Sequence, residues 1–355
     1  MTLDFSDLHD ELRSVAGDLL GKQRGGAVAL NVLARAGWTG LEVAEDRGGA
    51  GATFREVAIV GEEMGRAAVA SGFLGAAVFS VGLLNELQPS GLRDQLLSGL
   101  AAGTVGVATA IPGDHRDFEP AFRVDSAGHV SGSAAFVPDV VGAAWVLLPA
   151  VGVDGDVVVA AVRGEQLSVV NQAVLDETRS LATVSADSAP AEVLTVAGDP
   201  VSVLGAVRDR ACVALACDSL GVAAAMLDAT VDYVKVREQF DRPIGSFQAV
   251  KHACADMLVR VTVARQLVSA ASVAVAEGDP DAARAAAKAK AYCGEAAVEV
   301  AGKAMQLHGG IGYTWESGIH TYLKRATLNR ALFGGPAEHR AFLSRERAGL
   351  YSDTP

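Results

Sequence analysis

Apolar residues recur at helical intervals through the first hundred residues of the chain. In residues 4–20 many apolar side chains are three or four positions apart, which puts them on one face of a helix. They include Leu8, Leu12, Val15 and Leu19. Similar patterns cover residues 28–36 and 54–66, and glycines separate the two. We therefore predict a helical N-terminal domain over residues 1–103.

The hydrophobic pattern changes after residue 103. Short valine-rich runs alternate with Gly, Asp and Pro, at residues 105–110, 129–136, 144–149 and 156–162. Short apolar runs bounded by turn residues are typical of β-strands, and their spacing favours antiparallel pairing. We predict that residues 104–198 form a central antiparallel β-barrel or β-sandwich.

The last part of the chain is helical again and rich in alanine. Long helical patterns cover about 202–236, 246–277 and 280–307, and a further helix follows Gly335. Before the third helix, Asp279 is suited to cap its start and Pro280 to occupy its first turn. Long antiparallel helices with short connections predict a four-helix bundle over residues 199–355. The expected fold class is therefore α+β with three domains.

Composition narrows the class of protein without identifying it. The 355 residues are half apolar and carry a net charge of −12, whereas a nucleic-acid surface needs a basic stripe. No apolar run reaches the roughly 18 residues of a membrane helix, and the polar N-terminus is unlike a signal peptide. The cysteines form no CxxC pair, and no metal-ligand spacing is present. We expect a cytoplasmic protein that inserts into no membrane and binds neither nucleic acid nor metal.

A cationic connection between the first two bundle helices is the first candidate for chemistry. Residues 237–248 read REQFDRPIGSFQ. Arg237 directly follows the first long helix, where its guanidinium can make a bidentate contact to a phosphate group. Phe240 and Phe247 flank this arginine and offer flat surfaces to an aromatic ring. The alternative interpretation is structural, because an arginine at a helix end can also bond the last carbonyls of that helix.

A glycine-rich segment at the end of the third helix is the second candidate. Residues 306–313 read QLHGGIGY, with three glycines in four positions. Without Cβ atoms the backbone can be approached closely, and its free amides can face a phosphate or a ring edge. The alternative is that glycine simply ends the helix. Neither segment is specific alone, but together they are suited to a phosphorylated aromatic cofactor.

Together with other motifs, these segments resemble the acyl-CoA dehydrogenase family over nearly the whole chain. The similar stretches are Leu33–Trp38, Gly48–Gly51, Glu62–Arg66, Leu220–Gly221, Tyr233–Phe240, Pro243–Gln248, Ala255–Met257 and Gln306–Tyr313 with Glu316. The resemblance implies FAD as the cofactor, an acyl-CoA thioester as the substrate and electron-transfer flavoprotein as the electron acceptor. It also implies an oligomer.

The resemblance further implies which residues contact FAD. They are Arg237, Gln239, Phe240, Phe247, Gln248, Gln306, Leu307, His308, Gly309 and Gly310. In this family such groups reach across a subunit interface to an FAD that is seated mainly in the neighbouring subunit. The chain would therefore lend this half of a cofactor site to another subunit.

The chain departs from the family at the catalytic base. Family members remove the α-proton of the substrate with a glutamate, usually just before a Gly-Thr pair at the start of the last helix. The matching stretch here contains Phe333, Gly334 and Gly335, and none of these side chains can accept a proton.

Three carboxylates near the implied positions are weak candidates for a displaced base, namely Asp209, Glu316 and Glu338. Some family members place the base on the first bundle helix, near Ala211 here. Asp209 is two residues from that position, which is roughly 200° around a helix. A capping or solvated role is the alternative for all three.

The segments with which a subunit normally holds its own flavin also differ from the family pattern. Family members carry Thr-Glu-Pro and Trp-Ile-Thr segments that hold the flavin ring. The corresponding stretches here are Ala110–Pro112 and Phe136–Pro138. Phe136 can still pack near a ring, but the hydroxyl donor is missing.

Three functions remain open from the sequence. The first is a subunit of a heteromeric acyl-CoA dehydrogenase, of the kind that acts on steroid side-chain CoA esters in actinobacteria, with a paralogous partner supplying the base. The second is a homotetrameric acyl-CoA dehydrogenase with a displaced carboxylate base. The third is a non-enzymatic scaffold that has lost FAD.

Overall fold

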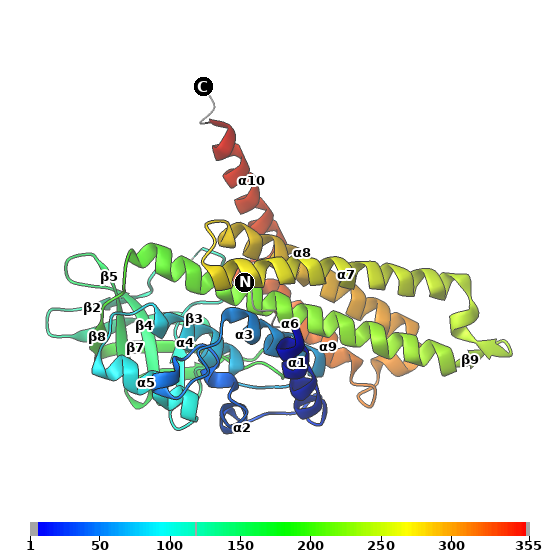
Figure 1. Ribbon diagram of the computed structural model, residues 1–355, viewed down its shortest axis with the longest axis horizontal. Helices are drawn as coiled ribbons and strands as arrows, with labels where there is room; N and C mark the ends of the chain where they lie inside the picture. Colours follow the sequence, from blue (N-terminus) through cyan, green and yellow to red (C-terminus); the bar gives the residue numbers. More distant parts are fainter. Residues whose placement is uncertain (1–5, 118, 353–355) are drawn as a thin grey trace.

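The structure is a computed structural model that describes residues 6–117 and 119–352 (Figure 1). Helices come first, strands run from Val107 to Leu194, and long helices follow from Pro200. The β-domain lies at one end of an elongated molecule and the bundle extends to the other end. This arrangement confirms the predicted α+β class. Residues 4 and 5 of the first predicted helix lie outside the described residues.

Short helices make up the N-terminal region. They are α1 (Ser6–Gly21), α2 (Leu30–Arg35), η1 (Trp38–Gly40), η2 (Glu45–Arg47), α3 (Phe54–Ala67), the π-helical η3 (Leu74–Ser80), α4 (Val81–Asn85) and α5 (Gly91–Ala102). A capping box starts α3, because the Thr53 N–H donates to Glu56 Oε2 at 2.8 Å and Thr53 Oγ1 accepts from the Arg55 N–H at 3.2 Å. The motif holds the start of the helix that packs most closely on the bundle.

Two glycines allow α3 and the first bundle helix, α6 (Pro200–Val236), to touch backbone to backbone. A Cβ atom on Gly65 would lie 2.0 Å from the Asp218 carbonyl oxygen. A Cβ atom on Gly221 would lie 1.9 Å from the Glu62 carbonyl oxygen. No side chain fits in such a crossing, so these glycines fix the N-terminal helices against the bundle.

Eight strands form one sheet in the central domain. They are β1 (Val107–Thr109), β2 (Phe122–Val124), β3 (His129–Pro138), β4 (Trp145–Val151), β5 (Val157–Arg163), β6 (Ser168–Asn171), β7 (Leu181–Pro190) and β8 (Glu192–Leu194). The order across the sheet is β6-β7-β3-β2-β4-β5-β8, and β1 also pairs with β4. Most neighbours are antiparallel, as predicted, but β1 and β2 both run parallel to β4.

β1 and β2 together occupy one strand position beside β4, as two halves of one interrupted strand. β1 pairs with the start of β4, Val107 lying opposite Trp145, and β2 pairs with its end, Phe122 lying opposite Ala150. The chain leaves the sheet after Ala110, whose N–H still donates to the Leu147 carbonyl at 2.8 Å, and returns at Phe122. The sequence pattern showed short apolar runs but not that two of them share one strand position.

The central strands are buried on both faces. In β4 and β5, Val146, Leu148 and Ala160 point into a core enclosed by the β-domain. Their neighbours Leu147 and Val159 point the other way, into the large core shared with the helices. Because successive side chains of a strand face opposite sides, burial of both faces gives a continuous apolar run rather than an alternating one.

The C-terminal region is a helical bundle, as predicted. Besides α6 it contains α7 (Gln248–Glu277), α8 (Ala282–Leu307), α9 (Ile319–Ala331) and α10 (Pro336–Ser352). The first four helices lie side by side, and α10 packs on α8 before it extends away from the bundle (Figure 1). The short elements β9 (Glu238–Gln239), β10 (Arg242–Pro243) and η5 (Ile244–Ser246) connect α6 to α7, and η6 (Gly309–Tyr313) follows α8.

The predicted start of the third long helix was wrong by two residues. α8 begins at Ala282, and Pro280 lies outside it. The Asp279 side chain instead accepts the Asp281 N–H at 2.7 Å, which makes a local turn. Aspartate offers the backbone such a turn as readily as a helix cap, and sequence alone does not separate the two.

Two bundle helices are long and apolar enough to cross a membrane by length and composition alone, contrary to the expectation that no run would be. In α6, 94% of the most apolar window is buried inside the protein, and in α7 the share is 33%. Burial of this extent identifies α6 as the central helix of the bundle. The composition of α6 therefore reflects its packing inside the protein.

Candidate functional site

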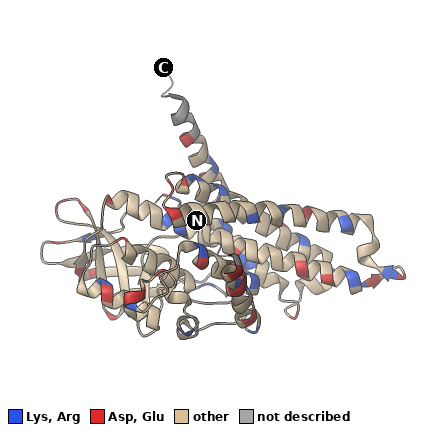
Figure 2. Cartoon of the chain, viewed as in Figure 1, with Lys and Arg blue, Asp and Glu red and all other residues tan. Residues whose placement is uncertain are grey.

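The cationic connection is a β-hairpin at the far end of the bundle. β9 and β10 pair in antiparallel fashion, with Gln239 opposite Arg242. The two turn residues, Phe240 and Asp241, have φ angles of 55° and 61°. Positive φ at both central positions is characteristic of the type I′ turn that suits two-residue hairpins. Figure 2 shows charges of both signs around this hairpin.

Phe240 is an unusual residue for such a turn. Bulky side chains rarely adopt positive φ, and strained backbone of this kind collects at functional sites. The side chain is 84% exposed, and its ring meets Phe247 edge-on with centroids 6.1 Å apart. The Arg242 guanidinium lies 4.0 Å from the centre of the Phe247 ring. The hairpin therefore presents an aromatic and cationic surface.

Arg237 lies at the base of the hairpin with a free side chain. Its N–H donates to the Tyr233 carbonyl at 2.9 Å, and its own carbonyl accepts from the Ile244 N–H at 2.8 Å. The guanidinium is exposed and makes no ion pair or hydrogen bond with any residue that the structure describes. It does not bond the carbonyls of α6, so its surroundings favour the phosphate interpretation over the structural one.

The three glycines after α8 differ in whether the structure requires glycine at their positions. Gly309 has a φ of 60°, which ends the helix. Gly312 is required by packing, since a Cβ atom there would lie 2.4 Å from the Met305 carbonyl oxygen. Gly310 has neither a positive φ nor any atom within 4 Å of a Cβ position. Nothing within the chain requires glycine at position 310, so open backbone there is available to a ligand.

A ring stack joins the glycine segment to the hairpin. The Tyr233 ring, one turn before Arg237, stacks on the His308 imidazole with centroids 4.4 Å apart. His308 Nδ1 also lies 2.8 Å from the Ala304 carbonyl oxygen, and the ring is buried. The structure thus brings the two predicted segments together, and His308 holds the loop in place with its side chain turned inward.

Most of the other implied FAD contacts face outward at this end. The exposed ones are Arg237, Gln239, Phe240, Gln248, Gln306, Gly309 and Gly310, while Phe247 and Leu307 are partly exposed. Amide, guanidinium and backbone N–H groups are suited to phosphate oxygens, and the aromatic side chains to a flat ring. We call these residues the bundle-end half-site.

The three segments that depart from the family pattern meet near the other end of α6. The Phe333 N–H donates to the Gly113 carbonyl at 2.8 Å. A Cβ atom on Gly113 would lie 2.7 Å from the Phe136 carbonyl oxygen and 3.1 Å from Leu332 Cδ2. Residues that are far apart in the sequence therefore depart from the family at one place.

Phe333 is part of the protein core. Its side chain is fully buried, and its ring lies 5.2 Å from that of Phe79. Its carbonyl lies 3.0 Å from His339 Nε2. Lys290 Nζ donates to the next carbonyl, that of Gly334, at 2.9 Å. Burial lowers the pKa of Lys290 to about 8, and burial together with the nearby Lys290 charge lowers the pKa of His339 to about 3.

The three candidate carboxylates lie in different places. Glu338 accepts the Gly335 N–H at 2.8 Å and caps the start of α10, and Glu316 is exposed beyond η6. Asp209 is buried on α6 about one turn before the residues that contact Phe333, and burial raises its pKa. Its carboxylate accepts from Arg208 Nε at 3.0 Å. Asp209 alone among them is both buried and near Phe333.

The two ends are too far apart to serve one flavin ring within a single chain. Cys212 Sγ lies 3.9 Å from the Phe333 carbonyl oxygen, so Cys212 marks the Phe333 end of α6. Arg237 follows 25 residues later, at about 1.5 Å of rise per residue, which separates the ends by roughly 37 Å. A flavin ring beside Phe333 of the same chain would therefore lie out of reach of the bundle-end half-site.

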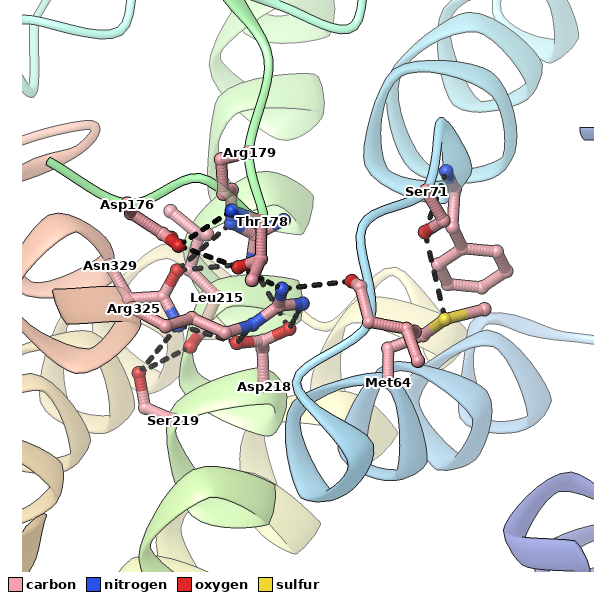
Figure 3. Close-up of polar contacts among 12 residues, drawn as sticks. Met64, Ser71, Asp176, Thr178, Arg179, Leu215, Asp218, Ser219, Arg325 and Asn329 are labelled. Atoms are coloured by element: carbon pink, nitrogen blue, oxygen red, sulfur yellow. Dashed lines mark hydrogen bonds and ion pairs between the residues drawn. The ribbon is translucent and has the colours of Figure 1, made fainter. Parts of the chain in front are cut away.

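A buried polar network joins the three regions and was missed by sequence reasoning (Figure 3). The Arg325 guanidinium makes two bonds to the Asp218 carboxylate, at 2.9 and 2.6 Å, and also reaches Val69 O and Thr178 Oγ1. Arg179 Nη2 lies 3.0 Å from the same carboxylate. The network links α6 and α9 of the bundle to the N-terminal region and the β-domain.

The two arginines of the network keep the buried Asp218 carboxyl group ionised. Burial alone would raise the pKa of Asp218, but Arg325 and Arg179 outweigh it and lower the pKa to about 2. Asn329 Nδ2 adds a hydrogen bond to the carboxylate at 2.6 Å. The one signal in the sequence was a lone aspartate in a long apolar stretch of α6, which in a buried helix needs a partner.

Comparison with known proteins identifies the family. The family model described as acyl-CoA dehydrogenase, N-terminal domain, matches residues 9–104, and the one described as acyl-CoA dehydrogenase, C-terminal domain, matches residues 207–347. The acyl-CoA dehydrogenase IpdE2 of Mycobacterium tuberculosis is 33% identical over 307 residues, which cover 85% of this chain and 80% of IpdE2. The chain belongs to the acyl-CoA dehydrogenase family, whose members are oxidoreductases acting on CH–CH donors.

Further similarities extend over the whole fold. The acyl-CoA dehydrogenase FadE34 of the same organism is 36% identical over 305 residues, which cover 85% of this chain but 40% of FadE34. The solved structure titled Tcur3481-Tcur3483 steroid ACAD G363A variant has a TM-score of 0.86 at 26% identity, covering 98% of this chain and 100% of that one. The ChsE4-ChsE5 complex from Mycobacterium tuberculosis has the same fold, with a TM-score of 0.85 at 24% identity and full coverage of both chains.

The residues at the two ends fit FAD unequally. The bundle-end half-site offers unpaired donors and open backbone at Gly310, which fits the phosphates and rings of FAD. The other end offers a buried phenylalanine, glycines and no carboxylate at the position of the family's base. Among the described residues, no group of three or more His, Cys, Asp and Glu side chains is placed to hold a metal ion.

Proposed function

We propose that this chain is one subunit of a heteromeric acyl-CoA dehydrogenase. Its bundle-end half-site would contact an FAD whose ring lies in a paralogous partner subunit, and that partner would supply the catalytic carboxylate. The observation that carries the proposal is the asymmetry between the ends of α6. One end has free donors at Arg237 and Gly310, and the other has Phe333 and Gly334 where the family has its base.

The reaction is the α,β-desaturation of an acyl-CoA thioester. FAD, when bound, supplies the acceptor for the hydride that leaves the β-carbon, and electron-transfer flavoprotein is the acceptor we propose for the reduced assembly. This chain binds and orients the cofactor through Arg237, the hairpin and the Gly309–Gly310 backbone. The proton from the α-carbon goes to the partner's carboxylate, because the position at Phe333 and Gly334 offers none.

Two similarities support a mixed assembly. The related steroid enzyme structure is named after two different chains. FadE34 is long enough that the part beyond its match exceeds this whole chain, so that one polypeptide has room for two such modules. The steroid enzyme also supports a bulky acyl-CoA, of the steroid side-chain type, as the substrate class.

Co-expression with a paralogous acyl-CoA dehydrogenase that carries the glutamate tests the proposal. We expect a stable mixed oligomer with about half an FAD per chain, and activity on acyl-CoA that neither chain shows alone. A pure preparation of this chain that forms a flavin-loaded homotetramer and turns over acyl-CoA would contradict it. Absence of flavin with every partner tested would favour the scaffold without FAD.

A homotetramer with Asp209 as the base is the second candidate function, because this carboxylate is buried near Phe333 with a raised pKa. The Arg208 contact weighs against it, since the carboxylate already has a cationic partner. Asp209→Asn should abolish turnover by the pure chain if this candidate is right. Glu295→Gln is the matched control, because Glu295 pairs with Arg340 on the surface of the bundle.

A further inference from the structure

The loop that interrupts the β1–β2 strand places Arg116 directly against Gly334. A Cβ atom on Gly334 would lie 2.6 Å from Arg116 Cβ, 3.1 Å from its Cα and 3.2 Å from its backbone nitrogen. These atoms belong to the backbone or its first side-chain carbon, so they cannot swing aside as the end of a long side chain can. The space that a side chain at position 334 needs is therefore already filled.

Several contacts hold this loop in place. Arg116 is 4% exposed, its guanidinium lies 3.6 Å from the centre of the Phe342 ring, and it pairs with Asp117. Upstream in the loop, the Gly113 carbonyl accepts the Phe333 N–H. Loop and bundle therefore meet through a backbone hydrogen bond and an aromatic contact.

The fit of Arg116 is imperfect in one respect. Its Nε and Nη2 atoms are buried and have no hydrogen-bond partner among the described residues. A buried guanidinium with unpaired donors is unfavourable by itself. The side chain is nonetheless buried against the Phe342 ring, so this contact is part of the packed fold.

We propose that residues 113–117 plug this chain's own flavin and acyl position, with Arg116 packed on Gly334, the residue that follows the position of the family's base. The inference rests on the proposed function and goes beyond it. The chain's own half-site has not only lost a base but is closed to ring and thioester alike. A glutamate restored at position 333 could not reach a substrate without displacement of this loop, whose Gly113 carbonyl accepts the N–H of that residue.

Cys212 provides a reporter of closure. Its thiol is fully buried beside the Phe333 carbonyl, and burial raises its pKa to about 11. Cys293 is equally buried but contacts Ala264 O in the bundle, so it reports on unfolding of the helices instead. Cys254 is partly exposed and serves as a reactive reference.

The experiment treats the purified full chain with N-ethylmaleimide and follows each cysteine by mass spectrometry. We expect the wild type to label Cys254 and to spare Cys212 and Cys293. Arg116→Ala removes the guanidinium that anchors the loop to Phe342, so it should label Cys212 at least about tenfold faster. Cys293 should stay protected, because local opening does not require unfolding. Arg345→Ala is the matched control, since this exposed arginine also faces Asp117, at 4.0 Å.

The result can overturn the proposal in two ways. Cys212 labelling as fast as Cys254 in the wild type would contradict a closed site. Labelling of Cys212 unchanged by Arg116→Ala would contradict a loop held closed by the Arg116 side chain. If Arg116→Ala unfolds the protein, N-ethylmaleimide also modifies Cys293. A second pair of variants then tests whether the position at Gly334 is filled.

That pair is Gly334→Ala and Gly335→Ala. Gly334 has a φ of 92°, so alanine there is strained by the backbone as well as by the contact with Arg116. Gly334→Ala should lower the thermal midpoint by at least roughly 4 °C, and by clearly less when Arg116→Gly removes the Arg116 Cβ atom. Gly335→Ala should be close to wild type, because the nearest atom to its Cβ position is Glu338 Oε2 at 3.8 Å. An equal loss for Gly334→Ala with and without Arg116→Gly would contradict the plug. Failure of the proposed function would instead appear as absent flavin in every mixed assembly, which leaves both readouts unaffected.

Discussion

The Tyr233 ring stacks on the His308 imidazole with ring centroids 4.4 Å apart, and its hydroxyl donates to the His308 carbonyl at 3.4 Å. This contact fixes the end of α6 against the loop after α8. It therefore sets the relative positions of Arg237 and Gly310, which no direct contact joins.

Removing the stack should weaken FAD binding in the mixed assembly. Tyr233→Ala leaves the two segments free to separate, and an aromatic pair is worth up to about 1.5 kcal/mol, so we expect affinity to fall by about tenfold. Tyr233→Phe keeps the stack and loses only a long hydrogen bond, so its affinity should stay close to wild type. Flavin fluorescence titration measures both. Equal affinity of Tyr233→Ala and wild type would show that the contact does not position the site.

The guanidinium of Arg237 should matter more than its charge. Arg237→Ala is expected to lower FAD affinity by roughly 10- to 100-fold, as for the loss of hydrogen bonds to a charged group. Arg237→Lys keeps the charge but not the bidentate geometry, and should recover only part of the loss. Lys235→Ala is a control for general charge, because this lysine lies on the last turn of α6 and pairs with Asp232. A loss as large for Lys235→Ala would mean that charge alone is sensed.

The buried Asp218 carboxylate should be essential for stability. Asp218→Asn leaves Arg325 and Arg179 buried without their counter-charge, which costs about 3–5 kcal/mol. The thermal midpoint of this 355-residue chain should therefore fall by roughly 4–7 °C. Glu295→Gln breaks the exposed pair with Arg340 and should have little effect, since such pairs contribute little. A small effect of Asp218→Asn would mean that the network does not hold the three regions together.

The buried His339 should make the fold sensitive to mild acid. The unfolded chain protonates this histidine below about pH 6.5, whereas the folded pKa is about 3. Between these values the unfolded state binds more protons, so stability falls as pH is lowered, by at most about 1.4 kcal/mol per pH unit. His339→Gln should flatten this slope between about pH 6.5 and 4.5, above the range in which Asp218 titrates. Thermal midpoints at several pH values measure it, and parallel slopes would contradict the burial argument.

The hydrophobic pattern was sufficient for the fold class and failed where tertiary contacts decide local structure. Helical periods gave the N-terminal helices such as α3, because one face of each is buried, and long alanine-rich apolar stretches gave the bundle helices, of which α6 is buried nearly all round. Strand runs gave the β-domain but not its connectivity. The parallel pairing of β1 and β2 with β4 depends on a loop that leaves the sheet, and periodicity carries no signal for that.

The cofactor segments and the missing base were both readable in the sequence, because glycines, arginine and the absent glutamate leave direct marks in the residue order. Only the tertiary structure decided what these marks mean for Arg237, Gly310 and Arg116. It showed that the Arg237 side chain has no partner among the described residues and that packing does not require glycine at position 310. It also showed that Arg116 fills the space beside Gly334. Each of these depends on atoms brought together from distant segments, and local sequence has no record of which distant segment will lie beside it.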